Sequence, residues 1–198
     1  KDQNVPRETL LEFESFVDML IRKNDQINII SKETAKNDVI RNRHILDSAQ
    51  IIDFIDFNSK NIIDIGSGGG MPGIIVSIMI KNMERNLKVI LYEKSHHKCA
   101  FLKKASKDLK LNTVVIKKNI FEEENLDTGT IMTRAFKPLP IVLDLVFKNF
   151  KNYKNLIIFM GKSGEKVLEE TLNSWEFDFE KKQSITNEDS FLLNIKNI

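Results

Sequence analysis

The stretch Asp64-Ile65-Gly66-Ser67-Gly68-Gly69-Gly70-Met71-Pro72-Gly73 follows an apolar segment and precedes a second one that is long enough for a helix. Five of its ten residues are glycine. Glycine adopts positive φ angles and has no β-carbon, so a ligand can lie directly on the main chain where a strand ends. Each glycine also costs about 1 kcal/mol of ordering entropy, which a connection without a ligand would not recover. The stretch therefore predicts a ligand-binding turn.

Two classes of nucleoside ligand fit this turn. Its second half, 68–73, satisfies the dinucleotide spacing G-x-G-x-x-G. Asp64 followed by glycine at every second position is instead typical of S-adenosylmethionine sites. An acid at the strand end can accept hydrogen bonds near the methionine ammonium group, whereas it would repel a pyrophosphate. Asp64 therefore favours S-adenosylmethionine, and Glu93, at the end of the next predicted strand, is expected to accept hydrogen bonds from the ribose hydroxyls.

Downstream of the turn, short apolar strands alternate with helices, a pattern typical of a parallel sheet covered on both faces. We expect parallel strands at 61–65, 87–92, 113–117, 131–133 and 156–160. The helices that connect and follow them are expected at 72–83, 95–110, 138–150 and 165–172. Two final strands, 175–180 and 190–195, flank a turn-rich stretch and predict a closing antiparallel hairpin. A dinucleotide-binding fold continues its parallel winding, so this ending favours a methyltransferase.

Two helices are predicted before the first strand. Pro6 stands at a helix-starting position, and apolar residues follow it at a three-to-four spacing: Leu10, Phe13, Val17 and Leu20. This pattern predicts an amphipathic helix that ends near Asn24. A second helix is expected over 37–55, where His44 and Asp47 fall within the apolar stripe.

The composition is that of an ordinary globular protein. Of the 198 residues, 41% are hydrophobic and 29% are charged, which excludes disordered and fibrous classes. No apolar run approaches the roughly 18 residues of a membrane span, so no membrane partner is expected. The single cysteine, Cys99, excludes an internal disulfide and a cysteine-based zinc cluster, and it indicates a cytoplasmic location. We expect a single domain, 1–198, with a helical extension, 1–57, before an α/β core, 58–198.

The net charge does not identify a partner. At +2 it is too small to predict a nucleic-acid ligand by itself. The helix expected at 95–110 nevertheless has a basic outer face, formed by Lys98, Lys103, Lys104, Lys107 and Lys110. Such a face is either solvated or in contact with RNA, and both interpretations stay open.

Four segments, in their order and spacing, resemble the small-subunit ribosomal RNA methyltransferase G family, RsmG or GidB. They are Arg43-His44-Ile45-Leu46-Asp47-Ser48, the turn 64–73, Lys98-Cys99-Ala100-Phe101-Leu102, and Thr133-Arg134-Ala135-Phe136. The resemblance covers about residues 25 to 170. It is far more specific than one glycine motif, because four separate segments agree.

The resemblance implies a fold and an activity. The fold is α/β, the Rossmann-like sheet of a class I S-adenosylmethionine-dependent methyltransferase, mostly parallel with a C-terminal antiparallel hairpin and an N-terminal helical extension. The implied reaction is methyl transfer from S-adenosylmethionine to N7 of one guanine in the decoding-region loop of 16S rRNA. The implied partner is 16S rRNA or a precursor of the small ribosomal subunit, and we expect a monomer.

The resemblance also carries site residues over to this sequence. With the turn residues, the candidate cofactor-binding set is Asp64, Gly66, Gly68, Gly70, Met71, Glu93, Ile120, Phe121 and Arg134. Family members usually have an aromatic residue or leucine at the position of Met71 and an Ala-Glu pair at 120–121, although methionine can still pack on adenine. Candidates for substrate contact or structural support are Arg43, His44, Asp47 and Lys137.

The implied chemistry needs little proton transfer. Guanine N7 already carries a lone pair, so no general base is expected, and Arg134 is assigned a positioning role in catalysis. Alignment of the reactants can be worth about 7 to 11 kcal/mol. His44 and Asp47, one helical turn apart, are better explained as a structural pair, and no metal site is expected. Arg134 and Lys137 would contact cofactor, phosphate or guanine O6, unless they are merely a surface pair.

Three other functions fit parts of the sequence. A methyltransferase of small molecules or proteins would use the same cofactor turn. A nicotinamide-dependent oxidoreductase is favoured only by the G-x-G-x-x-G spacing. A non-catalytic RNA-binding protein could retain the fold without cofactor binding.

Overall fold

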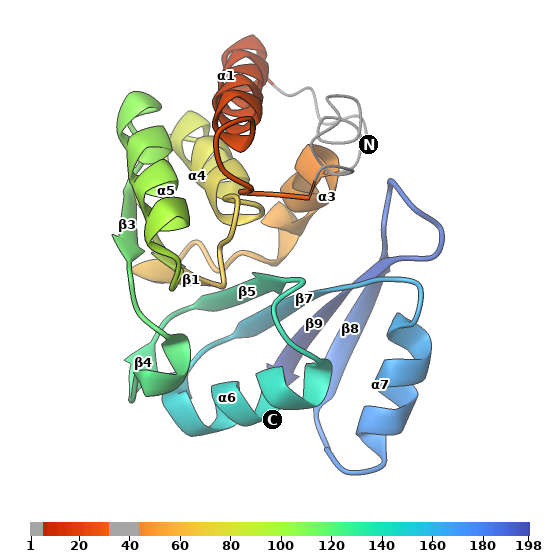
Figure 1. Cartoon of the computed structure of the whole chain (residues 1–198). Helices are drawn as coiled ribbons and strands as arrows, with labels where there is room; N and C mark the ends of the chain where they lie inside the picture. The colour runs from red at the N-terminus through yellow and green to blue at the C-terminus, as the bar shows by residue number, and fades with distance from the viewer. Residues whose placement is uncertain (1–5, 32–43) are drawn as a thin grey trace.

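The computed structural model describes residues 6–31 and 44–198. Its centre is a seven-stranded sheet with the strand order β3-β2-β1-β5-β7-β9-β8 (Figure 1). The parallel strands are β1 (Asn61–Ile65), β2 (Lys88–Tyr92), β3 (Thr113–Ile116), β5 (Thr130–Arg134) and β7 (Asn155–Met160). The antiparallel strands that complete the sheet are β8 (Asp178–Gln183) and β9 (Phe191–Asn197). The predicted parallel sheet with a closing hairpin is confirmed.

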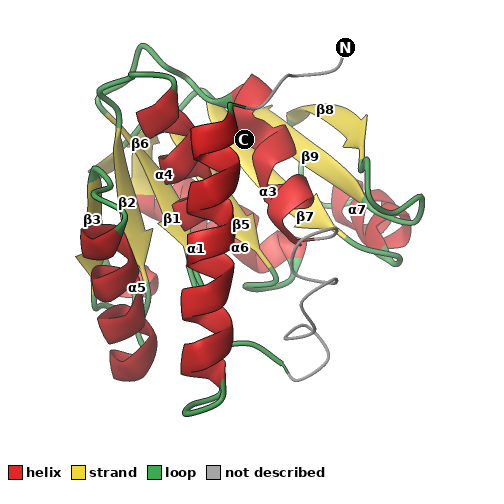
Figure 2. Ribbon diagram, turned by 90° about the horizontal axis from the view of Figure 1, so that it is seen from above, coloured by secondary structure: helices red, strands yellow, loops and turns green. Residues whose placement is uncertain are grey.

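Helices cover both faces of the sheet (Figures 1 and 2). One face carries α1 (Arg7–Asn24), α3 (Leu46–Ala49), α4 (Gly73–Asn82) and α5 (His96–Asp108). The other face carries α6 (Leu139–Asn149) and α7 (Gly164–Leu172). The chain winds to one side of β1 through β2 and β3, and then to the other side through β5 and β7. In such sheets ligands bind outside the carboxyl ends of the strands where the winding reverses, which here is at β1 and β5.

The strand β1 shows how the alternation of residues along a strand places side chains on the two faces of the sheet. Successive residues of a strand point to opposite faces of a sheet. Ile62 accordingly packs in the apolar cluster under α1, α4 and α5, while Ile63 and Ile65 pack in the cluster with α6 and α7. Asp64 shares the face of Ile62, so its carboxyl group lies under α4 rather than above the strand end.

The first helix, α1, packs on α4 and α5 through one face. Phe13, Phe16, Val17 and Leu20 are buried there, as the apolar spacing predicts. Leu10 was expected on the same stripe, but the structure exposes half of its surface, and Thr9 is buried in its place. The expectation for Leu10 was wrong because the helix is rotated toward the side of Thr9.

The structure differs from the predicted elements at three places. Residues 37–43 of the second expected helix lie outside the described residues, and its remainder is α3 followed by a 3-10 helix, η2 (Gln50–Phe54). The first hairpin strand begins at Asp178 instead of 175, and Trp175 lies before it with its ring against Phe147. A short parallel ladder of β4 (Leu126–Asp127) and β6 (Phe150–Asn152) was not predicted.

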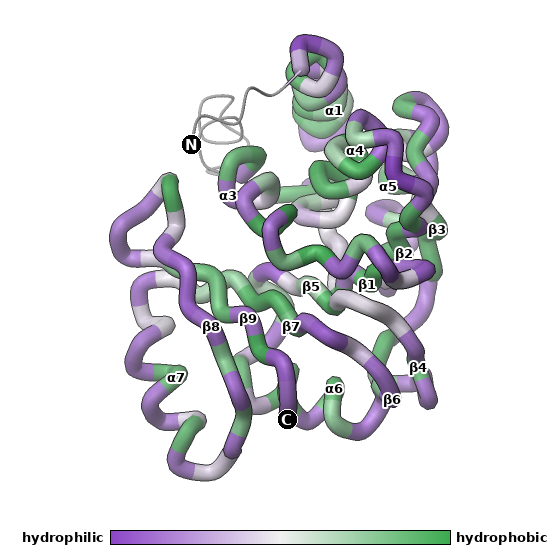
Figure 3. Tube along the Cα trace, turned by 180° about the vertical axis from the view of Figure 1, so that it is seen from behind, coloured by the Kyte–Doolittle hydropathy of each residue, from purple (hydrophilic) through white to green (hydrophobic). Residues whose placement is uncertain are grey.

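The outer strand β8 is hydrophilic along most of its length (Figure 3). Its sequence, Asp-Phe-Glu-Lys-Lys-Gln, places charges on an edge that no further strand covers within the described residues. Charged side chains at a sheet edge oppose pairing with another chain. Among the described helices, none combines the length and the apolar character that crossing a membrane requires.

Candidate active site

A cavity of about 610 Å³ lies at the carboxyl ends of β1, β2 and β5 and beside the loop after β3. Carboxyl ends of parallel strands lie at one edge of a sheet, so the four following loops meet there. Its lining comes from the loops at 66–69, 71, 92–94, 118–121 and 134–137, from Lys98 of α5, and from 29–31 and His44 of the N-terminal part.

The glycine turn after β1 forms the floor of this cavity. Gly66 and Gly68 have φ angles of +71° and +53°, in the left-handed region that glycine tolerates best. A β-carbon at Gly68 would meet only the carbonyl oxygen of Gly66, at 3.6 Å, so the main chain there is open to a ligand. Gly70 is different, because a β-carbon there would overlap Ile74, and Gly70 does not line the cavity. Gly70 thus allows close packing of the turn on the helices.

Asp64 supports the turn from below. Its side chain is buried, and Oδ2 accepts a hydrogen bond of 3.1 Å from the backbone N–H of Gly73. Burial raises the pKa of Asp64 to about 7. The residue does not line the cavity, so the arrangement does not include the contact with a methionine ammonium group that the sequence predicted. Its visible role is to hold the end of the turn at the start of α4.

Glu93 joins the turn to the loop after β2. Its Oε2 accepts a hydrogen bond of 3.0 Å from the backbone N–H of Gly68, and Oε1 accepts one of 2.8 Å from that of Ser95. The side chain lines the cavity and is largely buried. A carboxylate has about four acceptor positions, so those left over can take the two hydroxyls of a ribose. The structure therefore places Glu93 where the sequence expected an acceptor.

Two aromatic rings stand together at the side of the cavity. Phe121 belongs to a short 3-10 helix, η3 (Ile120–Glu122), and Phe136 to the loop after β5. Their rings are stacked with centroids 6.0 Å apart. Phe136 also lies so close to Gly66 that a β-carbon there would be 2.4 Å from the ring. Phe136 was missing from the predicted contacts, although its place right after Thr133-Arg134-Ala135 was a usable signal.

Other predicted contacts also line the cavity. Met71 and Ile120 contribute apolar surface, and Lys137 contributes a charge. Arg43 lies outside the described residues. Three further lysines line the cavity: Lys94, Lys98 and Lys118. The sequence did not predict them as residues of this site. The charged residues of the lining are therefore mainly cationic, with Glu93 as the acid among them.

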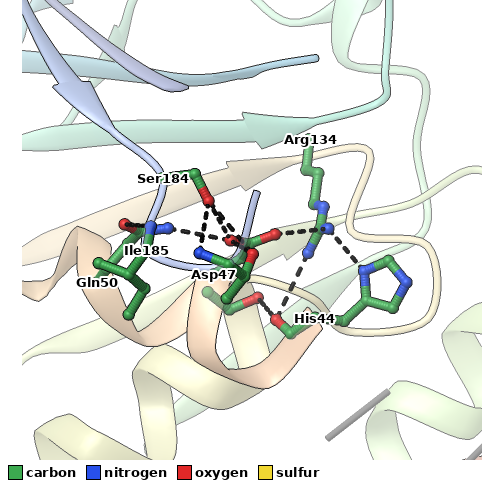
Figure 4. A network of polar contacts seen from close by, with 8 residues as sticks. His44, Asp47, Gln50, Arg134, Ser184 and Ile185 are labelled. Atoms are coloured by element: carbon green, nitrogen blue, oxygen red, sulfur yellow. Dashed lines mark hydrogen bonds and ion pairs between the residues drawn. The ribbon is translucent and has the colours of Figure 1, made fainter. Parts of the chain in front are cut away.

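Arg134, at the end of β5, contacts two polar residues of the N-terminal part, His44 and Asp47 (Figure 4). Its guanidinium lies 2.6 Å from Nδ1 of His44 and 3.3 Å from Oδ2 of Asp47. It also donates to the backbone oxygen of His44 at 3.4 Å and stands 5.2 Å from the centre of the Phe159 ring. His44 and Asp47, which the sequence predicts as a structural pair, are thus both bonded to Arg134, which connects them to the sheet.

Asp47 is also held from the other side, by the turn between β8 and β9 (Figure 4). Its Oδ1 accepts hydrogen bonds from the hydroxyls of Ser184, at 2.8 Å, and Thr186. Gln50 donates to the same oxygen at 3.1 Å. Sequence reasoning missed these partners, because no local spacing relates Asp47 to residues more than 130 positions away.

The site suits an adenosine ligand. A volume of about 610 Å³ falls within the range of small-molecule pockets. The exposed main chain at Gly68 and the acceptor Glu93 match a sugar. A purine ring can pack on the apolar surface of Met71, Ile120 and Phe121. Within the described residues, no group of three or more histidine, cysteine or acidic side chains could hold a metal ion.

Comparison with known proteins identifies the family of the chain. A family model described as "GidB: rRNA small subunit methyltransferase G" matches residues 9–191. A protein named "Ribosomal RNA small subunit methyltransferase G" from Pelagibacter ubique is 74% identical over 198 residues, which cover all of this chain and 93% of that protein. A protein of the same name from Rickettsia felis is 35% identical over 194 residues, covering 98% of this chain and 96% of that protein.

Solved structures support the fold at low sequence identity. A SAM-dependent methyltransferase from Aquifex aeolicus has a TM-score of 0.62 at 13% identity, covering 84% of this chain and 96% of its own. An rRNA methylase from Escherichia coli has a TM-score of 0.61 at 9% identity, covering 96% and 77%. These likenesses show a class I methyltransferase fold. With the family model matching most of the sequence, the chain belongs to the rRNA small subunit methyltransferase G family.

Proposed function

We propose that this protein transfers the methyl group of S-adenosylmethionine to N7 of one guanine in the decoding-region loop of 16S rRNA. The observation that carries the proposal is family membership over residues 9–191, joined to a nucleoside-sized cavity at the glycine turn. The substrate is 16S rRNA itself or a precursor of the small ribosomal subunit. The protein would act as a monomer in the cytoplasm.

The residues of the cavity have distinct roles toward the cofactor. S-adenosylmethionine supplies an electrophilic methyl group on a positively charged sulfur. The main chain at Gly68 gives the cofactor room, Gly66 lets the Phe136 ring pack against the turn, and Glu93 accepts hydrogen bonds from the ribose. The side chains that bracket the adenine are Met71, Ile120 and Phe121. Asp64 and Gly70 act indirectly, by fixing the turn on α4.

The reaction requires alignment more than acid–base chemistry. N7 of guanine has a free lone pair and loses no proton on methylation, so the chain needs no general base. Its residues must hold N7 in line with the methyl group and exclude water, which can be worth about 7 to 11 kcal/mol. Arg134 is the positioning residue, because two protein groups fix its guanidinium at the edge of the cavity.

The charges around the cavity support an RNA substrate over a small neutral one. Lys94, Lys98, Lys118 and Lys137 line the cavity. RNA carries one negative charge at each phosphate, and lysines near the point of reaction attract that backbone. The outer face of α5 adds further lysines, although Lys104 is paired with Asp108.

The proposal is tested by mapping the modified nucleotide. Purified protein would be incubated with labelled S-adenosylmethionine and small ribosomal subunits that contain unmodified 16S rRNA transcribed in vitro. We expect a single 7-methylguanosine in the decoding-region loop, detected by nuclease digestion and mass spectrometry. Deproteinised 16S rRNA serves as the second substrate form. Methylation of ribosomal proteins without any methylation of either RNA form would overturn the proposal.

A further inference from the structure

A second cavity, of about 290 Å³, adjoins the first at the end of β5. Both cavities are lined by Arg134 and Ala135. The second one continues along the ends of β7 and β9 and is closed by the turn between β8 and β9. Three other cavities within the described residues share no lining residue with the first. Among these cavities, the second is therefore the one that adjoins the proposed cofactor site.

We propose that this second cavity receives the target guanine, an inference that rests on the proposed function. Enzymes that modify a base inside structured nucleic acid turn it out of the stack and hold it in a pocket. The reacting atoms must approach to about 3 to 3.5 Å, so the pocket has to open onto the methyl donor. The two cavities meet at Arg134 and Ala135, so a base in the second would lie next to a cofactor in the first.

The wall of the cavity offers surfaces that suit a purine ring. Phe159 lines it with an aromatic ring that carries the Arg134 guanidinium 5.2 Å from its centre, and Met160 is also part of the lining. Gly161 exposes main chain, and a β-carbon there would meet no atom within 4 Å. A flat base can therefore lie against the main chain of Gly161 and beside the guanidinium of Arg134. Unpaired RNA bases are commonly held by stacking of this kind.

The polar groups of the wall favour guanine over adenine. With N7 turned toward the cofactor, the atom next to it on the same edge is O6 in guanine and an amino group in adenine. This edge would face Arg134, whose guanidinium only donates hydrogen bonds. O6 accepts such a bond and leaves N7 free, whereas the amino group of adenine would be opposed by it. Arg134 thus both anchors the base and rejects adenine.

The wall is fixed before the base arrives. Asp47 holds Arg134 through Oδ2 and the hairpin turn through Oδ1, so two sides of the cavity share one buried carboxylate. Gln50 strengthens the connection, because its amide donates to Asp47 and accepts from the backbone N–H of Ile185. A binding site held by such contacts loses little entropy when its ligand binds.

Gly161 gives a sharp test of the assignment. Its φ lies outside the left-handed region and its missing side chain would point into open space, so Gly161→Ala and Gly161→Leu should fold normally. Each would fill part of the second cavity without touching the first. We expect kcat/KM for 16S rRNA to fall in step with side-chain size, by on the order of 100-fold for leucine. The melting temperature and the affinity for S-adenosylhomocysteine should not change.

The control is Asn173→Leu, which adds the same side chain at the exposed end of α7, outside both cavities. It should keep the kcat/KM of the wild type. Normal kcat/KM in Gly161→Leu would overturn the assignment while the proposed function stands. Loss of S-adenosylhomocysteine affinity in that variant would also overturn it, because the change would then act on the first cavity. If the wild type methylates no rRNA, the proposed function fails, and the inference fails with it.

Discussion

At Asp64, burial and hydrogen bonding act in opposite directions on one carboxyl group. Burial raises its pKa to about 7, while the N–H of Gly73 stabilises the charged form. Its other oxygen, Oδ1, has no hydrogen-bond partner within the described residues. A buried acid with one unbonded oxygen is more stable when it is protonated. The group that holds the glycine turn thus makes the fold sensitive to pH.

Replacing Asp64 with asparagine should remove part of this sensitivity. Between the unfolded pKa of 3.8 and the folded value of about 7, the native protein keeps a proton that the unfolded chain releases. The free energy of unfolding therefore falls as pH rises through this window, by about 1.4 kcal/mol for each unit of pKa shift. In Asp64→Asn the amide oxygen can still accept from Gly73, and this slope should disappear. Urea unfolding of both proteins at pH 5, 6 and 8 measures the difference, and parallel curves would refute it.

Single residues of the site were predictable when strand ends placed them. Glu93 follows β2 and Arg134 ends β5, so the sheet topology alone brings both to one edge. The orientation of Asp64 was not predictable, because an acid at a strand end can point to either side of the sheet. Ser184 and Thr186 were also not predictable, since their contact with Asp47 depends on how the last hairpin lies over the earlier strands.

Among the elements, the hairpin of β8 and β9 is the one whose role extends beyond closing the sheet. Its turn places two hydroxyl donors on Asp47, which in turn contacts the guanidinium of Arg134 (Figure 4). The C-terminal hairpin therefore connects to the end of β5 through one residue of α3. An element that looks purely structural in the sequence helps to place a residue of the site.

Removing both hydroxyls, in Ser184→Ala with Thr186→Ala, should loosen this connection. We expect the double variant to lose about 1 kcal/mol of stability for each bond. Its kcat for rRNA should fall about tenfold, equivalent to about 1.4 kcal/mol, because Arg134 is less well held. Ser184→Thr with Thr186→Ser keeps the donors and should restore kcat. Ser174→Ala, which removes an exposed hydroxyl bonded to Thr171, is the control. Equal kcat in all four proteins would show that the hairpin only supports the fold.

The elements themselves were largely predictable. The expected helices and parallel strands of the core agree with the observed bounds to within two residues, because hydrophobic period is a local signal. The ladder of β4 and β6 escaped prediction, since two- and three-residue strands carry no period. Leu10 was misplaced because the stripe of α1 is set by packing against α4, which the local spacing does not determine.

In the whole molecule, one cavity connects parts of the chain that are distant in sequence. Ile29 and Ile30 come from the segment after α1, the glycine turn follows β1, and Phe121 follows β3. Hydrogen bonds from the backbone N–H groups of both isoleucines to Asn24 hold the first of these parts. A ligand in the cavity would contact all three parts, so its binding energy should oppose unfolding of the entire molecule.

Cofactor binding should therefore stabilise the protein as a unit. At a concentration of 100 times its dissociation constant, S-adenosylhomocysteine should add about 2.7 kcal/mol to the free energy of unfolding, whereas NAD or NADP should add nothing. Thermal melting with each ligand measures the effect. Glu93→Ala should lose most of the gain, because it removes the acceptor for the ribose and the support of Gly68. Glu169→Ala, on the exposed face of α7, should keep it. A gain of the same size in Glu93→Ala would mean that the cofactor binds without this carboxylate, and stabilisation by NAD alone would assign the turn to a dinucleotide.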